Sequence, residues 1–396
     1  MNAWAERAHD PVDLLEVLCG IDSANPAMGG PGEEQIARFL YRVLEAIGCD
    51  VQMPGIPSRA GRPNLIASLP GHPDHPTVLL EAHLDTVAHA RERQAVRRHE
   101  GRLYGRGACD TKGSAAAMVA AIARIAMKPD HPTVVFAGAA DEEVAMTGSR
   151  DLVGRLPRVE GAIIGEPTSL QPVRVHNGLM RFRIVARGRA AHTSRAHLGV
   201  NAVAIAARVV LAIEDELLPV LQARAHPLAG PALITAAVIH GGVAPNLVPD
   251  WCEIEVDRRL APGEDPEAAL AEVDVLITRL DAGGAIVREE PTILLPAVET
   301  PSDHWLVRLT EDAVGSMLGT SVLAGGVPYG TDASNLSGVG GIPCVVLGPG
   351  SIDQAHTDDE WVPIDEVIKA SRIYEELVSR VASGEVASKM GRTDRA

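Results

Sequence analysis

The positions of hydrophobic residues divide the first part of the chain into alternating helices and strands. Residues 32–49 and the alanine-rich stretch 113–127 have apolar positions typical of helices. Short apolar runs typical of buried strands lie at 64–70, 77–85, 133–143 and 161–167. Buried runs that alternate with helices predict an α/β fold, with a mostly parallel sheet flanked by helices.

The pattern changes from about residue 178. Alternating or apolar strands are predicted at 179–188, 232–242, 251–260 and 285–290, and helices at 202–217 and 267–280. Asn201 and Asp265, the latter followed by a proline, are typical of helix starts. The resulting order, β-α-β-β-α-β, is that of a ferredoxin-like unit, which can bury its own core. We therefore expect an inserted domain at 178–292.

The α/β pattern resumes after residue 293. A helix is predicted at 303–318, a buried strand at 343–350 and a final helix at 363–382, whereas 385–396 has no apolar periodicity and is expected to be a frayed tail. Residues 1–177 and 293–396 are thus expected to form one domain around the inserted one.

Composition narrows the class of protein. A chain of 396 residues that is 46% hydrophobic can form two domains with substantial cores. The excess of 52 Asp and Glu over 36 Lys and Arg argues against binding to nucleic acid or anionic membranes, so an anionic substrate would need a local arginine. Five scattered cysteines without a CxxC pair and a charged start without a signal-peptide pattern predict a cytoplasmic protein with reduced thiols.

Candidate catalytic residues gather where predicted strands end. His83 and Asp85 close one strand with side chains on the same side, a pairing that suits a metal-bound imidazole held by a carboxylate. The alternative for this pair is a surface histidine near a solvated aspartate. Further strands are followed by the remaining candidates, which are Glu142 and Glu143, Glu166, and His356.

Asp110 lies in a glycine-rich turn before the alanine-rich helix. The Walker order GxxxxGK[ST] is absent and the stretch GRGACD lacks the third glycine of a dinucleotide fingerprint, so a nucleotide loop is not supported. Asp110 is therefore either a carboxylate held at a helix entrance or an ordinary helix cap.

Two imidazoles and at least three carboxylates, without clustered thiols, suit zinc first and then cobalt or manganese. One ion would leave carboxylates uncompensated, whereas two ions bridged by one aspartate would neutralise them and activate water. We therefore expect two Zn²⁺ ions, with Co²⁺ or Mn²⁺ as substitutes.

The motifs that contain these residues resemble those of a known family. They are HLDTV, GRGACDTKG, DEEVAMTGS, IIGEPTSLQPVR, GRAAHTS and GPGSIDQAH. The chain resembles, over nearly its whole length, the dinuclear zinc amidohydrolases and peptidases that include acetylornithine deacetylase, succinyl-diaminopimelate desuccinylase, aminoacylase and glutamate carboxypeptidase. The stretches IIGEPTSLQPVR and LGPGSIDQAHTDDEW look most like those of acetylornithine deacetylases.

The resemblance implies a role for each residue. Asp110 bridges the metals; His83 and Glu166 bind one, while Glu143 and His356 bind the other. Glu142 is the general base, Asp85 orients His83, and His192 helps to stabilise the oxyanion, often from the partner subunit of a dimer. Asn246 and Arg259 contact the substrate. The inserted domain then serves as a lid and dimerisation domain, and Asp141 is left as a supporting or surface residue.

Two of these residues have a second interpretation. In 251–260, Arg259 falls on the polar face of its strand, where it could bind a carboxylate or form a surface ion pair with Asp257 or Glu255. Cys109, beside Asp110, is either a small buried filler or a thiol ligand.

The expected activity is hydrolysis of the amide of an N-acyl-L-amino acid, with N-acetylornithine as the first candidate. Alternatives are a desuccinylase, another N-acyl-amino-acid amidohydrolase, or a dipeptidase or carboxypeptidase. A catalytically inactive binding protein on the same scaffold is the alternative from another class. Neither GxSxG nor HExxH occurs, so a serine hydrolase and a one-zinc helix metalloprotease have no support. The expected partners are a small-molecule substrate and a second copy in a homodimer.

Overall fold

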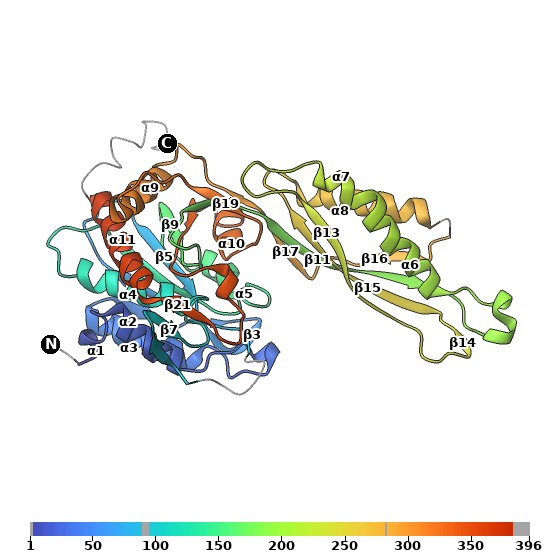
Figure 1. The fold of residues 1–396 in the computed structure, drawn as a ribbon, viewed down its shortest axis with the longest axis horizontal. Coiled ribbons are helices and arrows are strands. Elements are labelled where there is room, and N and C mark those ends of the chain that lie inside the picture. The colour runs from blue at the N-terminus through green and yellow to red at the C-terminus, as the bar shows by residue number, and fades with distance from the viewer. Residues whose placement is uncertain (1–2, 89–94, 282, 383–396) are drawn as a thin grey trace. The chain divides into compact units, whose positions relative to one another are not determined.

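The computed structural model describes residues 3–88, 95–281 and 283–382, and it divides into two compact units (Figure 1). The first unit comprises 1–174, 300–325 and 331–396, and the second comprises 175–299 and 326–330. The sequence-based domain limits, 178–292, fall inside the range of the second unit. The predicted tail at 385–396 lies outside the described residues.

The first unit is built on a mixed central sheet that is parallel in its centre, with the strand order β1-β4-β8-β5-β9-β20-β10-β18, and β19 also pairs with β10. Its four central strands, β8 (Val134–Ala139), β5 (Val78–His83), β9 (Gly161–Ile164) and β20 (Cys344–Val346), run parallel to one another. The outer strands are β1 (Asp50–Gln52), β4 (Leu65–Leu69), β10 (Val173–His176) and β19 (Gly325–Val327), together with β18 (Val298–Glu299), whose residues fall in the range of the second unit. The predicted α/β class is confirmed, and the predicted strand runs of this unit are neighbours in its sheet.

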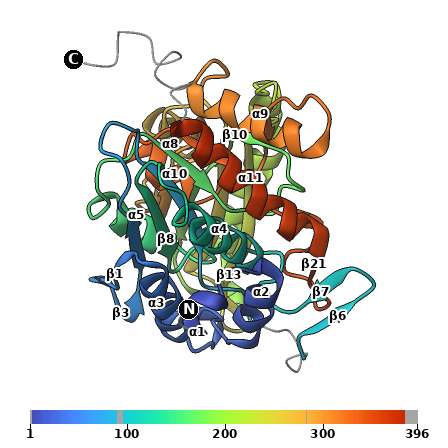
Figure 2. The same ribbon diagram turned by 90° about the vertical axis from the view of Figure 1, so that its left-hand side faces the viewer.

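Helices cover this sheet (Figure 2). The long ones form where the helical periodicity predicts them: α3 (Glu34–Ile47), α4 (Lys112–Ile125), α9 (Trp305–Leu318) and α11 (Ile364–Ala382). The other helices of this unit are α1 (Ala3–Glu6), α2 (Pro11–Gly20), α5 (Thr147–Val153) and α10 (Ala333–Gly338).

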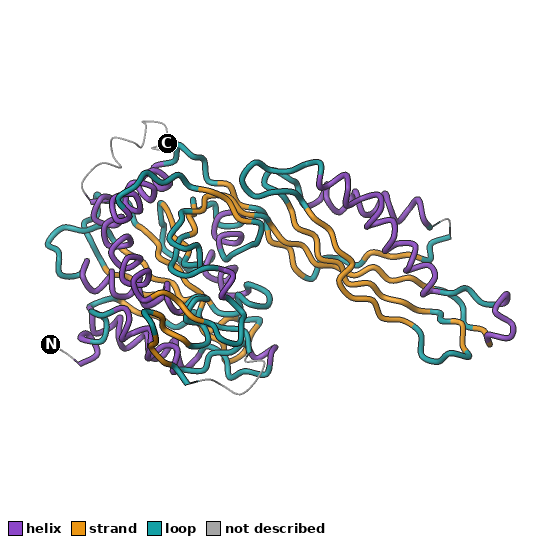
Figure 3. Tube along the Cα trace, in the orientation of Figure 1, coloured by secondary structure: helices purple, strands orange, loops and turns teal. Residues whose placement is uncertain are grey.

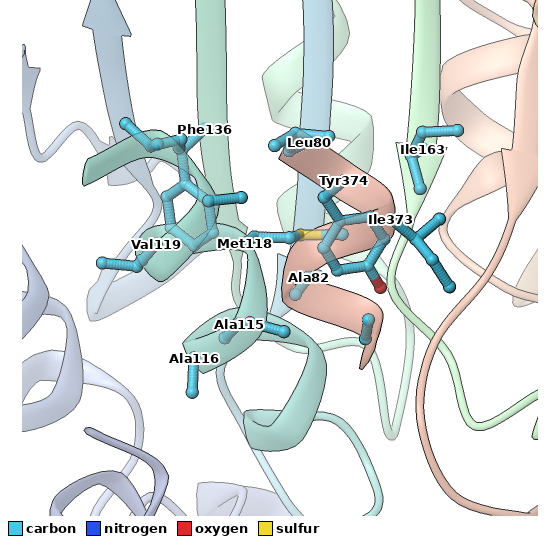
Figure 4. Packing of buried hydrophobic residues seen from close by; sticks show 14 of the residues in the cluster. Leu80, Ala82, Ala115, Ala116, Met118, Val119, Phe136, Ile163, Ile373 and Tyr374 are labelled. Atoms are coloured by element: carbon cyan, nitrogen blue, oxygen red, sulfur yellow. The ribbon is translucent and has the colours of Figure 1, made fainter. Parts of the chain in front are cut away.

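Small side chains let α4 pack closely between the sheet and α11. Nearly every residue of α4 is buried, and its alanines leave room for larger side chains of the neighbouring elements. Figure 4 shows Met118 of α4 beside Ile373 and Tyr374 of α11. The Tyr374 hydroxyl donates a hydrogen bond to the carbonyl oxygen of Leu347 at 2.7 Å, which satisfies the one polar group of that buried ring.

The second unit has the element order β-α-β-β-α-β. The elements are β11 (Gly178–Arg187), α6 (Ala202–Ala212), β13 (Leu233–Gly241), β15 (Trp251–Leu260), α8 (Pro266–Leu280) and β16 (Ile286–Arg288). The sheet order is β13-β15-β11-β16, and β17 (Ile293–Leu295) also pairs with β11. Figure 3 shows the long strands of this unit in orange and its helices in purple. Asn201 caps α6 by accepting from the N–H of Ala204, and Asp265 caps α8 by accepting from the N–H of Glu267, as predicted.

The helix predicted at 202–217 differs in detail. Regular α6 ends at Ala212, one wider π turn follows at Ile213–Leu217, and α7 (Leu218–Gln222) continues the chain. Pro219 lies in the first turn of α7 and has no N–H to donate to the preceding turn, which accounts for a helix that is interrupted here.

Several short elements have no clear periodicity and are not predicted from the sequence. They are the pair β2 (Gly55–Ile56) and β3 (Arg59–Pro63), the pair β12 (Ala191–His192) and β14 (Leu247–Val248), and a small sheet of β6 (Arg97–His99), β7 (Arg102–Tyr104) and β21 (Trp361–Pro363). Among the described helices, none is both long and apolar enough to cross a membrane.

Candidate active site

The candidate residues of the first unit follow the ends of its four parallel strands. His83 is the last residue of β5, Glu142 and Glu143 lie in a turn after β8, and Glu166 lies just after β9. His356 comes from the segment after β20, while Asp110 comes from the loop before α4. Because parallel strands present their carboxyl ends at one edge of a sheet, these separate segments converge there.

Asp110 stands between the two histidines. Its Oδ1 lies 3.0 Å from Nε2 of His83, and its Oδ2 lies 3.3 Å from Nε2 of His356. One carboxylate therefore presents a different oxygen to each imidazole. Burial alone would raise the pKa of Asp110, but hydrogen bonds from the two histidines hold it below its usual range.

Glu143 completes a compact group of metal-ligating atoms. One ligand atom from each of His83, Asp110 and Glu143 lies within 4.8 Å of the others. Glu143 Oε2 lies 3.0 Å from Nε2 of His356, and its Oε1 accepts a hydrogen bond from the N–H of Val87 at 3.1 Å. Each of these side chains comes from a different segment of the chain.

His83 is buried, not a surface histidine, and its ring has a defined orientation. Nδ1 lies 3.0 Å from the carbonyl oxygen of Asp85, which can only accept, so Nδ1 carries the hydrogen. Nε2 is then the nitrogen available to a metal. The Asp85 carboxylate lies farther away, with Oδ1 at 3.6 Å from Nδ1, and accepts instead from the N–H groups of Glu142 and Glu143 at 3.0 and 3.3 Å.

Glu142 and Glu166 are held in an acidic environment. Burial raises the pKa of both carboxyl groups well above the ordinary value, and the charges of neighbouring carboxylates, including Asp332, raise it further. Burial also raises the pKa of Asp332 to about 6. These carboxyl groups therefore resist ionisation unless a further positive charge lies near them.

This donor set fits divalent cations. Imidazole nitrogens and carboxylate oxygens are the ligands that zinc, cobalt and manganese accept. Hydrogen bonds that His356 donates to the carboxylates of Asp110 and Glu143 raise its pKa to about 10, so the site already stabilises a positive charge at that point. A metal ion would meet the same attraction there.

Glu360 is a residue of this site that the sequence analysis does not identify. Its buried carboxylate accepts from the backbone N–H groups of Gly107, Cys109 and Asp110 at 2.9, 2.9 and 3.1 Å, and from Nη1 of Arg106 at 2.9 Å. It thereby fastens the loop that carries Asp110. The available signal was its place in the segment that also contains His356.

The structure answers the open interpretations of Asp110 and Cys109. The N-terminal cap position of α4 is Thr111, and the Asp110 side chain faces the histidines, so Asp110 is not an ordinary helix cap. Cys109 is fully buried, and its Sγ lies 3.2 Å from the carbonyl oxygen of Ser351. Burial raises the pKa of this thiol, which agrees with the interpretation as a buried filler.

His192 and Asn246 are brought together in the second unit. They lie at the paired short strands β12 and β14, where the N–H of Thr193 donates to the carbonyl oxygen of Asn246 at 3.1 Å. Both side chains are exposed, and Nδ1 of His192 lies 2.8 Å from the hydroxyl of Ser194. That contact engages Nδ1 of His192 and not Nε2.

Arg259 lies on the polar face of β15, as the alternation predicts, and Nε donates to Oδ1 of Asp257 at 2.8 Å. This is the ion pair considered from the sequence. The neighbouring Arg258 is buried on the opposite face, where Nη2 donates to Glu264 at 3.0 Å. Arg259 remains partly exposed with a guanidinium that has further donors.

Comparison with known proteins identifies the family. The family model described as peptidase family M20/M25/M40 matches residues 79–380. The chain belongs to this family. This match confirms the prediction, made from the motifs, of a hydrolase of the deacetylase and peptidase class. The similar proteins described next include one named as a deacetylase and one named as a peptidase.

A curated relative, acetylornithine deacetylase of Klebsiella pneumoniae (strain 342), is 34% identical over 361 residues, 88% of this chain and 90% of the relative. A tripeptidase structure from Staphylococcus aureus has a TM-score of 0.79 at 22% identity and covers 95% of this chain and 99% of its own. The Bacillus subtilis YXEP protein, described as a dinuclear metal-binding peptidase of the M20 family, has a TM-score of 0.71 at 18% identity, with 97% and 99% covered. These two structures share the fold of this chain.

Proposed function

We propose that this M20 hydrolase cleaves the amide bond of an N-acyl-L-amino acid, with N-acetylornithine as the first candidate substrate. The observation that carries the proposal is the position of Asp110, which presents one oxygen to His83 and the other to His356. This arrangement suits a carboxylate that bridges two metal ions. The name of the Klebsiella pneumoniae relative supports N-acetylornithine as the substrate.

The metal ligands are proposed as two sets that share Asp110. His83 and Glu166 would hold one ion, and Glu143 and His356 the other, with Zn²⁺ as the first candidate and Co²⁺ or Mn²⁺ as substitutes. When bound, such a pair polarises the substrate carbonyl and lowers the pKa of water. Asp85 supports the first set through its carbonyl oxygen, which fixes the ring of His83.

Glu142 is the proposed general base. Its carboxylate takes a proton from the attacking water, whose oxygen forms a bond to the amide carbon. When the carbon–nitrogen bond breaks, Glu142 passes that proton to the leaving amine, so the products are a carboxylate and an amino acid. General acid–base catalysis of this kind contributes about 10²–10⁴-fold to the rate.

Three residues of the second unit have proposed substrate roles. His192 stabilises the oxyanion that develops on the carbonyl oxygen, while Arg259 and Asn246 contact the amino-acid portion of the substrate. The planar guanidinium of Arg259 suits a carboxylate because it can donate two parallel hydrogen bonds. Binding would require Arg259 to exchange part of its present pairing with Asp257.

A substrate screen tests this proposal. Zinc-loaded and cobalt-loaded enzyme would be compared by kcat/KM on N-acetylornithine, N-succinyl-diaminopimelate, other N-acetyl amino acids, and dipeptides with a free amine. We expect N-acyl amino acids to be preferred, with N-acetylornithine highest. A preference for dipeptides would overturn the deacylase assignment, and no hydrolysis of any amide by metal-loaded protein would favour the inactive binding protein.

A further inference from the structure

Arg62 lies in a buried group of acidic side chains behind the turn that carries Glu142 and Glu143. It is 6% exposed, and its partners Glu33, Asp141 and Asp85 are fully buried. Nη1 lies 2.6 Å from Oδ1 of Asp141, Nε donates to Glu33 at 2.9 Å, and Nη2 contacts Glu33 and lies 3.9 Å from Oδ2 of Asp85. One guanidinium thus faces three carboxylates.

The turn itself has an unusual backbone. Asp141 has φ of 68°, in the left-handed region that non-glycine residues seldom occupy, so surrounding contacts must hold it. Its side chain accepts from Arg62, from Nδ2 of Asn25 at 3.1 Å and from the hydroxyl of Thr147 at 2.6 Å. Its N–H donates to Oε1 of Glu33 at 3.0 Å. The conformation of Asp141 therefore depends on the group around Arg62.

Asp85 extends this support to the two glutamates. Its carboxylate accepts from the N–H groups of Glu142 and Glu143, and Nδ2 of Asn25 donates to the same carboxylate at 2.7 Å. Asn25 therefore links Asp85 to Asp141. The backbone of Glu142 is fixed on one side by Asp85 and on the other by the turn that begins at Asp141.

Charge balance makes the guanidinium important to this group. Buried carboxylates left without a positive partner must protonate, admit water or move apart. A lysine would supply the charge at one point but not the fork that contacts Glu33 and Asp141 together. The loss of Arg62 would then release Asp141, and with it the turn that precedes Glu142.

We propose that Arg62 is a positioning residue for the hydrolytic reaction, acting through Asp141 and Asp85 to hold the backbone of Glu142 and Glu143. Its contribution to the rate rests on the proposed role of Glu142 as general base. Its contribution to the order of the turn does not.

A surface cavity beside Arg62 offers a way to test the proposal chemically. The cavity has a volume of about 780 Å³, and its lining includes Arg62, Tyr41 and Met53. Removal of the Arg62 side chain would extend this cavity towards Glu33 and Asp141. A small guanidinium ion could then enter and replace the missing group.

The test uses the full-length, metal-loaded enzyme and three variants: Arg62→Ala, Arg62→Lys and the control Arg124→Ala. Arg124 forms a comparable, largely buried pair with Glu375 at 2.6 Å, between α4 and α11.

We expect Arg62→Ala to lower kcat about 10- to 100-fold with KM within about threefold, by analogy with other supporting residues of metal sites. Millimolar guanidinium should raise the kcat of Arg62→Ala at least fivefold, whereas methylammonium should not raise it. Arg62→Lys should lose at least fivefold, and Arg124→Ala should keep the wild-type kcat.

Hydrogen exchange separates this proposal from the proposed function. Deuterium uptake in peptides that cover 140–147 should become at least tenfold faster in Arg62→Ala and Arg62→Lys but not in Arg124→Ala. This measurement needs no substrate, so it tests the positioning role even if no N-acyl amino acid is hydrolysed. If Arg62→Lys folds and its residues 140–147 take up deuterium at the wild-type rate, the proposal is overturned. A wild-type kcat in this variant would also overturn it. If Arg62→Ala fails to fold, Arg62→Lys decides.

Discussion

The backbone N–H of Asp110 donates a hydrogen bond to Oε1 of Glu360 at 3.1 Å. Glu360 lies in the same short segment as His356, which itself contacts the Asp110 carboxylate. The segment after β20 thus contacts Asp110 at two places. Glu360 binds the backbone N–H of Asp110, and His356 contacts its carboxylate. The position of the proposed bridging ligand is therefore coupled to the position of His356.

Substitution of Glu360 should weaken metal binding. In Glu360→Gln the amide nitrogen replaces one acceptor oxygen and meets N–H donors of the loop, so the loop would shift and carry Asp110 with it. Loss of a supporting partner typically costs about 10- to 100-fold in metal affinity. Competition with a zinc chelator measures this, with Glu376→Gln on the exposed side of α11 as the control. Unchanged zinc affinity in Glu360→Gln would show that this carboxylate does not support the site.

The two ligand sets predict different metal contents. Asp110→Ala removes the oxygens that face both histidines, so this variant should retain well under one ion per chain. His356→Ala removes a ligand of one set only and should retain close to one ion. Elemental analysis after gel filtration measures both values against wild-type protein. Equal metal loss in the two variants would contradict the shared-bridge arrangement.

His176 predicts a pH dependence of stability. This buried side chain has a pKa lowered to about 4, mainly because burial disfavours the charged form. Above about pH 6.5 the residue is neutral in both the folded and the unfolded protein, so it has no effect on stability. As the pH falls towards 4, the unfolded chain gains a proton that the folded chain does not, and the free energy of unfolding decreases.

The effect should amount to about 2 kcal/mol between pH 7.5 and pH 5. Chemical denaturation at the two pH values would compare wild-type protein with His176→Asn, whose amide N–H takes the place of Nδ1 towards the carbonyl oxygen of Asn177 and does not titrate. The variant should lose less stability than the wild type by about this amount. An equal loss in both proteins would exclude His176 as the cause.

The edge of the second unit predicts self-association. Strand β13 forms the end of its sheet, and its residues Val238 and Ile239 are 37% and 49% exposed. An exposed apolar edge strand is suited to pairing with another chain. We expect a homodimer through β13, and Ile239→Lys should shift the mass measured by light scattering towards the monomer. A monomeric wild-type protein would contradict this prediction.

Local patterns were enough to predict the sheet and the residues at its edge. The apolar runs that became β5, β8, β9 and β20 are long or distinctive enough to be recognised, and their parallel order brings their carboxyl ends together. Motif resemblance then distinguished Glu142 from Glu143, which spacing alone does not do. The long helices are predictable for the same reason, whereas the break at Ala212 is not, because the apolar periodicity continues past it.

The supporting residues could not be predicted because their contacts join distant parts of the chain. Arg62 meets Asp141 and Glu33, and Glu360 meets the loop before α4, through side chains whose neighbours are set only by the complete fold. Charge alone suggests a surface position for such residues, whereas the structure buries them. For Arg259, both the ion pair and a substrate contact fit the alternation of β15, and the structure records the ion pair.

Glu142 is the residue proposed to move the proton in a metal-dependent amide hydrolysis. The most direct measurement is kcat of Glu142→Gln, together with its metal content, on the best N-acyl amino acid for the wild-type enzyme. Glu142 is not among the proposed metal ligands, so the variant should keep two ions per chain while kcat falls by about 10²–10⁴-fold. A kcat within tenfold of the wild-type value, with two ions bound, would show that Glu142 is not the general base.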